Sequence, residues 1–269
     1  MNKTYKKVNQ YEQYWFIFLT VYAIIINKTI GAKSSKTIMP ADWFVRVIKE
    51  YLRRIAMDDR LEDLRSKKNP KARIKILKGH FATSNSHINT YIDMSTVKVR
   101  HNNARETAKV LASAYLTSTS VDTIVCLEDT DSIGTFMAEQ LADMNMLSLS
   151  KGNNISIVTP EYLSSGQMIF RDNKQRMIRN QQVLLLAASI TTGKSVKKAI
   201  DTVLYYGGTV CGICSIFSSI NKINGMEINT IFTSADLPDY RAYSPESCPM
   251  CKEGKRIEAI VNSFGYSKL

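Results

Sequence analysis

Short apolar runs alternate with amphipathic segments along most of the chain, from about residue 73 onward. The run 183–189 is rich in leucine and ends at turn residues, which is typical of a strand buried on both faces. The next segment, 195–206, repeats apolar residues at the spacing of one helix face. Strands and helices that alternate across short connections predict an α/β fold with a doubly wound, largely parallel sheet. The same criteria predict further helices at 104–116 and 133–145, and strands at 73–77, 90–94, 123–127, 155–159, 167–170, 210–218 and 230–232.

The residues before about 73 follow a different pattern. An amphipathic helix is predicted to begin at Asp42, and the charged segment 58–71 is predicted to be a linker. We therefore expect three parts: a basic and apolar extension over residues 1–38, a helix with its linker over 39–78, and a main domain over 79–269.

The apolar run 14–26 follows several lysines and so imitates the charged and hydrophobic regions of a signal peptide. It is shorter than the roughly 20 residues that a membrane-spanning helix needs. Since Met39 stands directly before the predicted helix, a start of translation at Met39 is one explanation of the extension. A membrane anchor and an additional packed element are the alternatives. We expect a cytoplasmic protein, with membrane contact only if the apolar run is an anchor.

The net charge of +12 is distributed unevenly. Residues 1–78 hold 18 Lys and Arg against 7 Asp and Glu, whereas residues 79–269 hold 18 against 17. The main domain is therefore almost neutral, and nucleic-acid binding would be a property of the N-terminal part alone. A solvated basic extension is the more common cause of such a charge run, so a nucleic-acid partner is not expected.

The connection between the predicted strand 183–189 and the predicted helix 195–206 is the strongest candidate for a binding site. A short loop at a helix N-terminus binds anions, because unpaired backbone N–H groups and the positive end of the helix dipole meet there. Its hydroxyl groups and its lysine add donors that suit a phosphate monoester. The candidate phosphate-binding residues are Ser189, Thr191, Thr192, Gly193, Lys194 and Ser195.

The sequence Leu-Leu-Leu-Ala-Ala-Ser-Ile-Thr-Thr-Gly-Lys-Ser, residues 184–195, resembles the phosphoribosyl-pyrophosphate motif of type I phosphoribosyltransferases, with the orotate branch closest. The resemblance implies a parallel sheet with a small hood region, here with an N-terminal helical extension. It also implies Mg²⁺ as cofactor, phosphoribosyl pyrophosphate or a nucleoside monophosphate as ligand, a homodimer, and a role in pyrimidine biosynthesis. In that family, two adjacent acidic residues bind the ribose hydroxyls; Ala187 and Ala188 occupy those positions here.

A second loop between a predicted strand and a predicted helix carries the carboxylates of Glu128, Asp129 and Asp131. In the phosphoribosyltransferase family the corresponding loop accepts pyrophosphate on its backbone N–H groups. Three carboxylates would repel pyrophosphate unless Mg²⁺, which favours carboxylate oxygens, lay between them. The alternative is that acidic residues only complement the helix dipole.

The segment 79–93 resembles the part of the orotate branch that folds over the base, which makes Phe81 and Ser84 candidate base-side residues. His80 and His87 lie in the same segment. A histidine in such a segment is more often a surface or hydrogen-bonding residue than a catalyst. No catalytic residue is assigned.

The five cysteines are expected to be reduced thiols. Cys248 and Cys251 form a zinc-knuckle-like C-x-x-C, but two thiolates do not complete a tetrahedral zinc site. Cys211 and Cys214 could supply the rest, although residues three apart in a strand point to opposite faces. A redox pair, a site shared across a dimer and a plain turn are the alternatives for Cys248 and Cys251. Cys126 lies on a buried strand and is expected in the core.

Two functional hypotheses follow. One is a divergent orotate phosphoribosyltransferase-like enzyme that transfers a phosphoribosyl group to a nucleobase with release of pyrophosphate. The other is a non-catalytic sensor of nucleotides or phosphoribosyl pyrophosphate on the same fold. The second hypothesis gains weight from Ala187 and Ala188, from the absence of the family's basic flexible loop, and from Ser218-Ser219 where the family has Asp-Arg.

Overall fold

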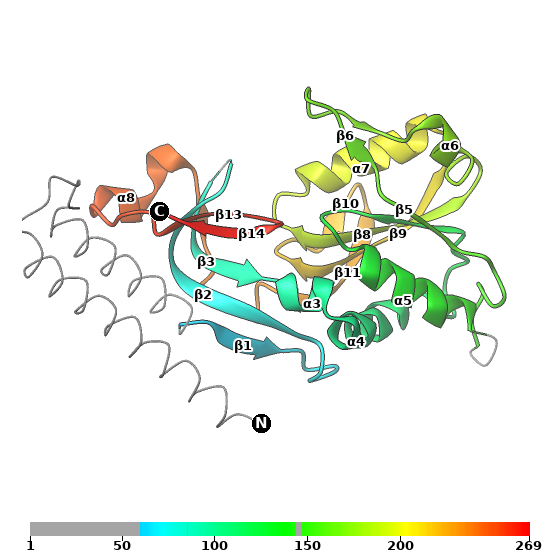
Figure 1. Ribbon diagram of the computed structural model, residues 1–269, viewed down its shortest axis with the longest axis horizontal. Coiled ribbons are helices and arrows are strands. Elements are labelled where there is room, and N and C mark those ends of the chain that lie inside the picture. The colour runs from blue at the N-terminus through cyan, green and yellow to red at the C-terminus, as the bar shows by residue number, and fades with distance from the viewer. Residues whose placement is uncertain (1–59, 85, 144–146) are drawn as a thin grey trace, which may run out of the picture. The chain divides into compact units, whose positions relative to one another are not determined.

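The computed structural model describes residues 60–269, apart from Asn85 and residues 144–146. Two six-stranded sheets dominate this part of the chain (Figure 1). The predictions for residues 1–38, for the apolar run 14–26 and for the helix at Asp42 lie outside the described residues. Within them, no helix is long and apolar enough to cross a bilayer.

The first sheet is largely parallel and has the strand order β10-β11-β9-β8-β4-β5. Only β10 and β11 pair antiparallel in it. This confirms the predicted α/β fold with a largely parallel sheet. The strands are β4 (Thr123–Cys126), β5 (Ser156–Val158), β8 (Gln182–Ile190), β9 (Thr209–Ser218), β10 (Lys222–Ile223) and β11 (Met226–Thr233).

Helices cover both faces of this sheet (Figure 1). The face with Leu184, Leu186 and Ala188 shares one apolar cluster with helices α4 and α5, and the face with Val183 and Leu185 shares another with α7. Successive residues of β8 thus enter different cores, which explains its unbroken apolar run. The helices are α3 (Ser95–Val99), α4 (His101–Ala112), α5 (Asp131–Ala142), α6 (Asp172–Gln175) and α7 (Lys194–Tyr205).

The second sheet, which we call the hood, has the order β12-β3-β2-β13-β14, with β1 paired to β2. Its pairs are antiparallel except β2 with β13, which are parallel. The elements of the hood and its C-terminal turn are β1 (Glu62–Arg65), β2 (Arg73–Ala82), β3 (His87–Asp93), β12 (Ala242–Tyr243), β13 (Ala259–Asn262), β14 (Gly265–Lys268), η1 (Pro245–Ser247) and α8 (Pro249–Lys252). A hairpin of β6 (Glu161–Tyr162) and β7 (Met168–Ile169) stands apart from both sheets.

Two predictions differ from the structure. The expected linker at 58–71 contains β1, whose charged residues form the outer strand of the hood, and the expected boundary after residue 78 falls inside β2. The second concerns Cys211 and Cys214, which face the same apolar cluster rather than opposite sides. The register of β8 and β9 shifts between Val183 and Leu184, and the extra residue in β9 breaks the two-residue alternation.

Gly134 lets α5 approach β4 closely. A Cβ atom at this position would lie 2.4 Å from Sγ of Cys126, which is fully buried as expected. We expect Gly134→Ala to lower the free energy of unfolding by about 1–2 kcal/mol, because overpacking of about 1–3 kcal/mol exceeds the gain in helix propensity. Cys126→Ala should restore most of this loss in the double variant, as measured by urea unfolding of both single variants and the pair. Strictly additive effects would contradict the close contact.

Candidate functional site

The candidate phosphate loop lies where β8 ends at Ile190 and α7 begins at Lys194. Gly193 is the N-cap residue and has φ of 75°, a left-handed conformation that glycine adopts without steric cost. Its buried position is packed against β10, since a Cβ atom there would lie 2.9 Å from Cδ1 of Ile223. This packing fixes the backbone at the start of a twelve-residue helix, where the first N–H groups have no intrahelical acceptor.

The side chains of this loop are available to a ligand. Thr191, Thr192, Lys194 and Ser195 are all exposed, and Ser189 is partly exposed. Ser219 stabilises the loop, because its hydroxyl donates a hydrogen bond to the carbonyl of Thr191 at 2.9 Å. The structure therefore brings the predicted hydroxyl groups, the lysine and the helix N-terminus together in one short turn.

The acidic loop after β4 has an unusual backbone. Glu128 and Asp129 have φ of 58° and 59°, and neither is glycine. Each left-handed non-glycine residue costs about 1–2 kcal/mol, and such residues concentrate at functional sites. The loop lies next to the phosphate loop, because the Glu128 carboxylate accepts a hydrogen bond from the backbone N–H of Ser189 at 3.0 Å.

The three carboxylates of the acidic loop have different surroundings. Glu128 turns toward the end of β8, and burial raises the pKa of its carboxyl group, while the hydrogen bond from Ser189 and the charge of Lys98 oppose that rise. Asp131 accepts a hydrogen bond from the Thr159 hydroxyl, and Asp129 is exposed. The three side chains therefore do not converge on a single point in this conformation, although Asp129 and Asp131 both remain exposed at the surface.

Lys98 is a buried cation that was not among the candidate site residues. It comes from α3, is only 6% exposed, and donates to the backbone carbonyls of Glu128, at 3.1 Å, and Ser263. Burial lowers the pKa of its ammonium group, whereas the nearby carboxylates of Asp129 and Glu128 oppose that effect. Ser263 belongs to the turn between β13 and β14, so Lys98 joins the acidic loop to the hood. Lysine is rarely buried, so the segment Ser95–Val99 gives no local signal that Lys98 is enclosed.

Two alanines stand where the family resemblance leads one to expect an acidic pair. Ala187 and Ala188 are 2% and 3% exposed, and they pack into the two cores on opposite faces of β8. The carboxylate near this strand end is instead that of Glu128, which comes from the neighbouring strand connection.

The two candidate base-side residues lie in different environments. Phe81 is completely buried in the hood, with its ring 6.2 Å from that of Tyr91, and in this conformation it offers no exposed surface to a base. Ser84 is exposed in the connection between β2 and β3.

The hairpin of β6 and β7 flanks the helix of the phosphate loop. Residues 160–170 contain no lysine or arginine. The hairpin is stabilised by Arg171, which donates two hydrogen bonds to the Glu161 carboxylate at 2.6 Å, and by Lys198 of α7, whose ammonium group donates to the carbonyl of Gly166.

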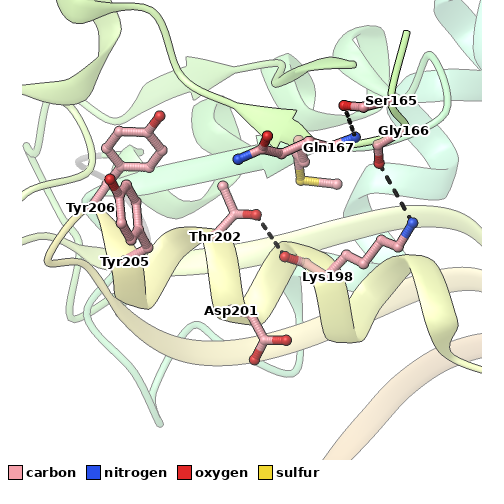
Figure 2. A pocket seen from close by; sticks show the side chains of 9 residues that line it. Ser165, Gly166, Gln167, Lys198, Asp201, Thr202, Tyr205 and Tyr206 are labelled. Carbon is pink, nitrogen blue, oxygen red and sulfur yellow. Dashed lines mark hydrogen bonds between the residues drawn. The ribbon is translucent and has the colours of Figure 1, made fainter. Parts of the chain in front are cut away.

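A groove with a volume of about 490 Å³ lies between the hairpin and α7. Residues such as Gln167, Thr202 and Tyr206 line it (Figure 2). The lining residues come from the hairpin and from the later turns of α7 and its end, and they do not include the loop 191–195.

Cys248 and Cys251 lie together in the C-terminal turn of the hood, but Cys211 and Cys214 are not their neighbours. The side chains beside them are His80 and His87, which were expected to be surface or hydrogen-bonding residues more often than catalysts. In the described part of the chain, this is the one group of at least three His, Cys, Asp or Glu side chains whose ligand atoms lie close enough to share a metal ion.

The sequence of this chain is similar to those of orotate phosphoribosyltransferases. No protein-family model matches the sequence. An orotate phosphoribosyltransferase of Chlorobium phaeobacteroides (strain DSM 266) is 26% identical over 187 residues, which cover 68% of this chain and 88% of that protein. The chain is related to the type I phosphoribosyltransferases. A second orotate phosphoribosyltransferase, from Chlorobaculum parvum, is 36% identical over 81 residues, or 30% of this chain and 40% of that protein.

Among solved structures, the orotate phosphoribosyltransferase of Mycobacterium tuberculosis H37Rv in complex with Fe(III) dicitrate is 16% identical, with a TM-score of 0.43. The similarity covers 61% of this chain and 92% of that chain. The sequence relationship to phosphoribosyltransferases agrees with the resemblance seen in residues 184–195.

Proposed function

We propose that this protein is a divergent, orotate phosphoribosyltransferase-like enzyme of nucleotide metabolism. It binds the 5′-phosphate of phosphoribosyl pyrophosphate, or of a nucleoside monophosphate, at residues Ser189 and Thr191–Ser195. The observation that carries this proposal is the phosphate loop itself, with Gly193 in a left-handed conformation and exposed hydroxyl groups at the start of α7. The relationship to proteins named orotate phosphoribosyltransferase supports it.

The proposed reaction breaks the bond between C1′ of the ribose and the pyrophosphate oxygen, and forms a bond from C1′ to a ring nitrogen of the base. Pyrophosphate leaves with the bonding electron pair, and the nitrogen loses its proton to solvent. Such a reaction depends on positioning and on stabilising charge in the transition state. The phosphate loop would hold the sugar in place, while the backbone of the acidic loop, shaped by the left-handed Glu128 and Asp129, would face the pyrophosphate.

Mg²⁺ belongs to this proposal, and its candidate protein ligands are Glu128, Asp129 and Asp131. Carboxylate oxygens with retained water are the ligands that Mg²⁺ prefers, and a bound ion would neutralise charge on the pyrophosphate. Asp129 and Asp131 are exposed, so both can reach a bound ion or its water without unfolding the loop. A homodimer is also part of the proposal, on the basis of the family resemblance.

A sensor that binds the same ligand without turnover is the second candidate function. Two observations favour it: Ala187 and Ala188 in place of the acidic pair, and the hairpin Glu161–Ile169, which carries no cation to cover a leaving pyrophosphate. Both functions share the phosphate loop and differ only in chemistry.

Calorimetry with phosphoribosyl pyrophosphate and with nucleoside monophosphates, with and without Mg²⁺, tests the shared part of the proposal. Release of pyrophosphate in the presence of a panel of bases then separates the two functions. Release that depends on Mg²⁺ and on one base would establish the enzyme, and binding without release would establish the sensor. An absence of binding to every sugar phosphate would refute both.

Thr192→Val tests whether the phosphate binds at this loop. It removes an exposed loop hydroxyl, and we expect about tenfold weaker binding of the sugar phosphate, since a hydrogen bond to a charged group contributes about 1.5–3 kcal/mol. Thr202→Val is the control, because Thr202 lies on the same helix, away from the loop, where its hydroxyl donates to the carbonyl of Lys198. Equal affinities of both variants would argue against the placement of the phosphate.

A further inference from the structure

Four side chains with metal-binding atoms meet at one end of the hood. His80 comes from β2, His87 begins β3, Cys248 is the N-cap residue of α8, and Cys251 lies in α8. His80 and Cys248 are 3% and 0% exposed, whereas Cys251 is exposed. One ligand atom from each residue lies within 4.8 Å of every other.

The spacing of these atoms matches a tetrahedral zinc site. Nε2 of His80 lies 3.2 Å from Nδ1 of His87 and 3.6 Å from Sγ of both Cys248 and Cys251, and Sγ of Cys251 lies 3.2 Å from Nδ1 of His87. Ordinary zinc bond lengths give edges of about 3.3 Å between two nitrogens and about 3.6 Å between nitrogen and sulfur in a tetrahedron. Four of the six distances among the ligand atoms are therefore close to the edges of a zinc tetrahedron, and the other two do not exceed 4.8 Å.

The second nitrogen of His80 fixes the orientation of the ring. Nδ1 of His80 lies 2.9 Å from the backbone carbonyl of Lys255, and because a carbonyl can only accept, Nδ1 carries the proton. Nε2 of the neutral ring then presents a lone pair to the cluster. Metal-binding histidines commonly donate their other N–H group to a carbonyl in this way.

Hydrogen bonds alone satisfy this cluster poorly. Nε2 of His80 faces Nδ1 of His87 and two sulfur atoms, yet its single lone pair can accept only one hydrogen bond. A cation at the centre would be bound by all four groups at once. Two sulfur and two imidazole ligands in a tetrahedron favour Zn²⁺ over Mg²⁺, which takes oxygen ligands.

The chain geometry also suits the site. Cys248 and Cys251 lie three residues apart at the start of one helical turn, which places both sulfur atoms on one side. The turn closes through Gly254, whose φ is 71° and whose N–H group donates to the carbonyl of Cys251 at 3.0 Å. A helix of four residues is too short to be stable alone, so an additional connection to β2 and β3 would stabilise it.

We propose that His80 Nε2, His87 Nδ1, Cys248 Sγ and Cys251 Sγ bind one structural Zn²⁺ that joins the C-terminal turn of the hood to the β2–β3 hairpin. Four protein ligands leave no open position for a substrate, so the ion has a structural role. The site does not depend on the proposed function, because it lies in the hood and shares no residue with the phosphate loop.

Metal analysis of the purified full-length protein tests this proposal. We expect about one zinc per chain for the wild type and for Cys211→Ser, a thiol control outside the cluster, and almost none for Cys251→Ser. Cys251 is the ligand of choice because it is exposed, so the serine should disturb packing little. A strong chelator should lower the melting temperature of the wild type and leave that of Cys251→Ser unchanged.

Cobalt substitution provides a second measurement that does not require a variant. Co²⁺ added to chelator-treated wild-type protein should show the intense visible absorption of a tetrahedral site and the thiolate charge-transfer band, and Zn²⁺ should displace it. A protein that takes up neither metal would overturn the proposal. So would a disulfide between Cys248 and Cys251, detected by mass spectrometry of the protein isolated without reductant.

Discussion

Gly193→Ala is expected to weaken the binding of a sugar phosphate by at least about tenfold. A tenfold change in the dissociation constant corresponds to about 1.4 kcal/mol of binding free energy. The alanine would have to adopt φ near 75°, and its Cβ atom would lie 2.9 Å from Ile223 and 3.2 Å from Ile220. Relief of this overlap must move the start of α7, and with it the N–H groups that face the phosphate. Calorimetry with phosphoribosyl pyrophosphate measures the change.

The matched control for this variant is Gly225→Ala. Gly225 has a φ of 81°, but a Cβ atom there meets nothing within 4 Å. Both variants therefore incur the cost of a left-handed alanine, about 1–2 kcal/mol of folding stability, and only Gly193→Ala adds the overlap at the loop. If Gly225→Ala reduced the affinity equally, the loss would reflect general destabilisation and the assignment of the phosphate loop would fail.

Lys98→Met is expected to lower the free energy of unfolding by about 2–3 kcal/mol. Methionine keeps the apolar length of the side chain but leaves the carbonyls of Glu128 and Ser263 without their buried donor, and each unsatisfied group costs about 1–3 kcal/mol. Removal of a buried charge offsets part of this loss. Urea unfolding of the wild type and the variant at neutral pH measures the difference.

The control for Lys98→Met is Lys197→Met, since Lys197 is exposed on α7. A surface substitution of this kind should change stability by no more than about 0.5 kcal/mol. Because Lys98 joins two parts of the structure, its loss should also increase hydrogen exchange in both the acidic loop and the β13–β14 turn. Faster exchange at only one of them would show that Lys98 does not connect the two.

Local pattern in the sequence predicts the parallel sheet well. Apolar runs and helical spacing depend on neighbours in the chain, and β8 and α7 differ from their predicted bounds by one residue at each end. The hood is harder to predict. β1 is a charged strand whose pairing with β2 leaves it at the surface, so its composition resembles that of a linker.

The surroundings of His80 and Phe81 show why site residues are harder still. The register of β2 against β3 shifts between Lys78 and Phe81, so two consecutive residues are both buried, Phe81 in the hood and His80 beside the cysteines. Strict alternation would have left one of them exposed. His80 also contacts Cys248, which lies 168 residues later in the chain. No local spacing in the sequence predicts such a contact.

The parallel pairing of β2 with β13 has a consequence for the synthesis of this protein. The strands of the core sheet all lie before Ser234, so that sheet can assemble while later residues are still inside the ribosome. The hood cannot be completed at that stage, because β13 and β14 lie in residues 259–268. Until then β1 covers only the first part of this edge of β2, and the part at Phe81 and Ala82 has no neighbour, so we expect the nascent chain to be most prone to aggregation during that interval.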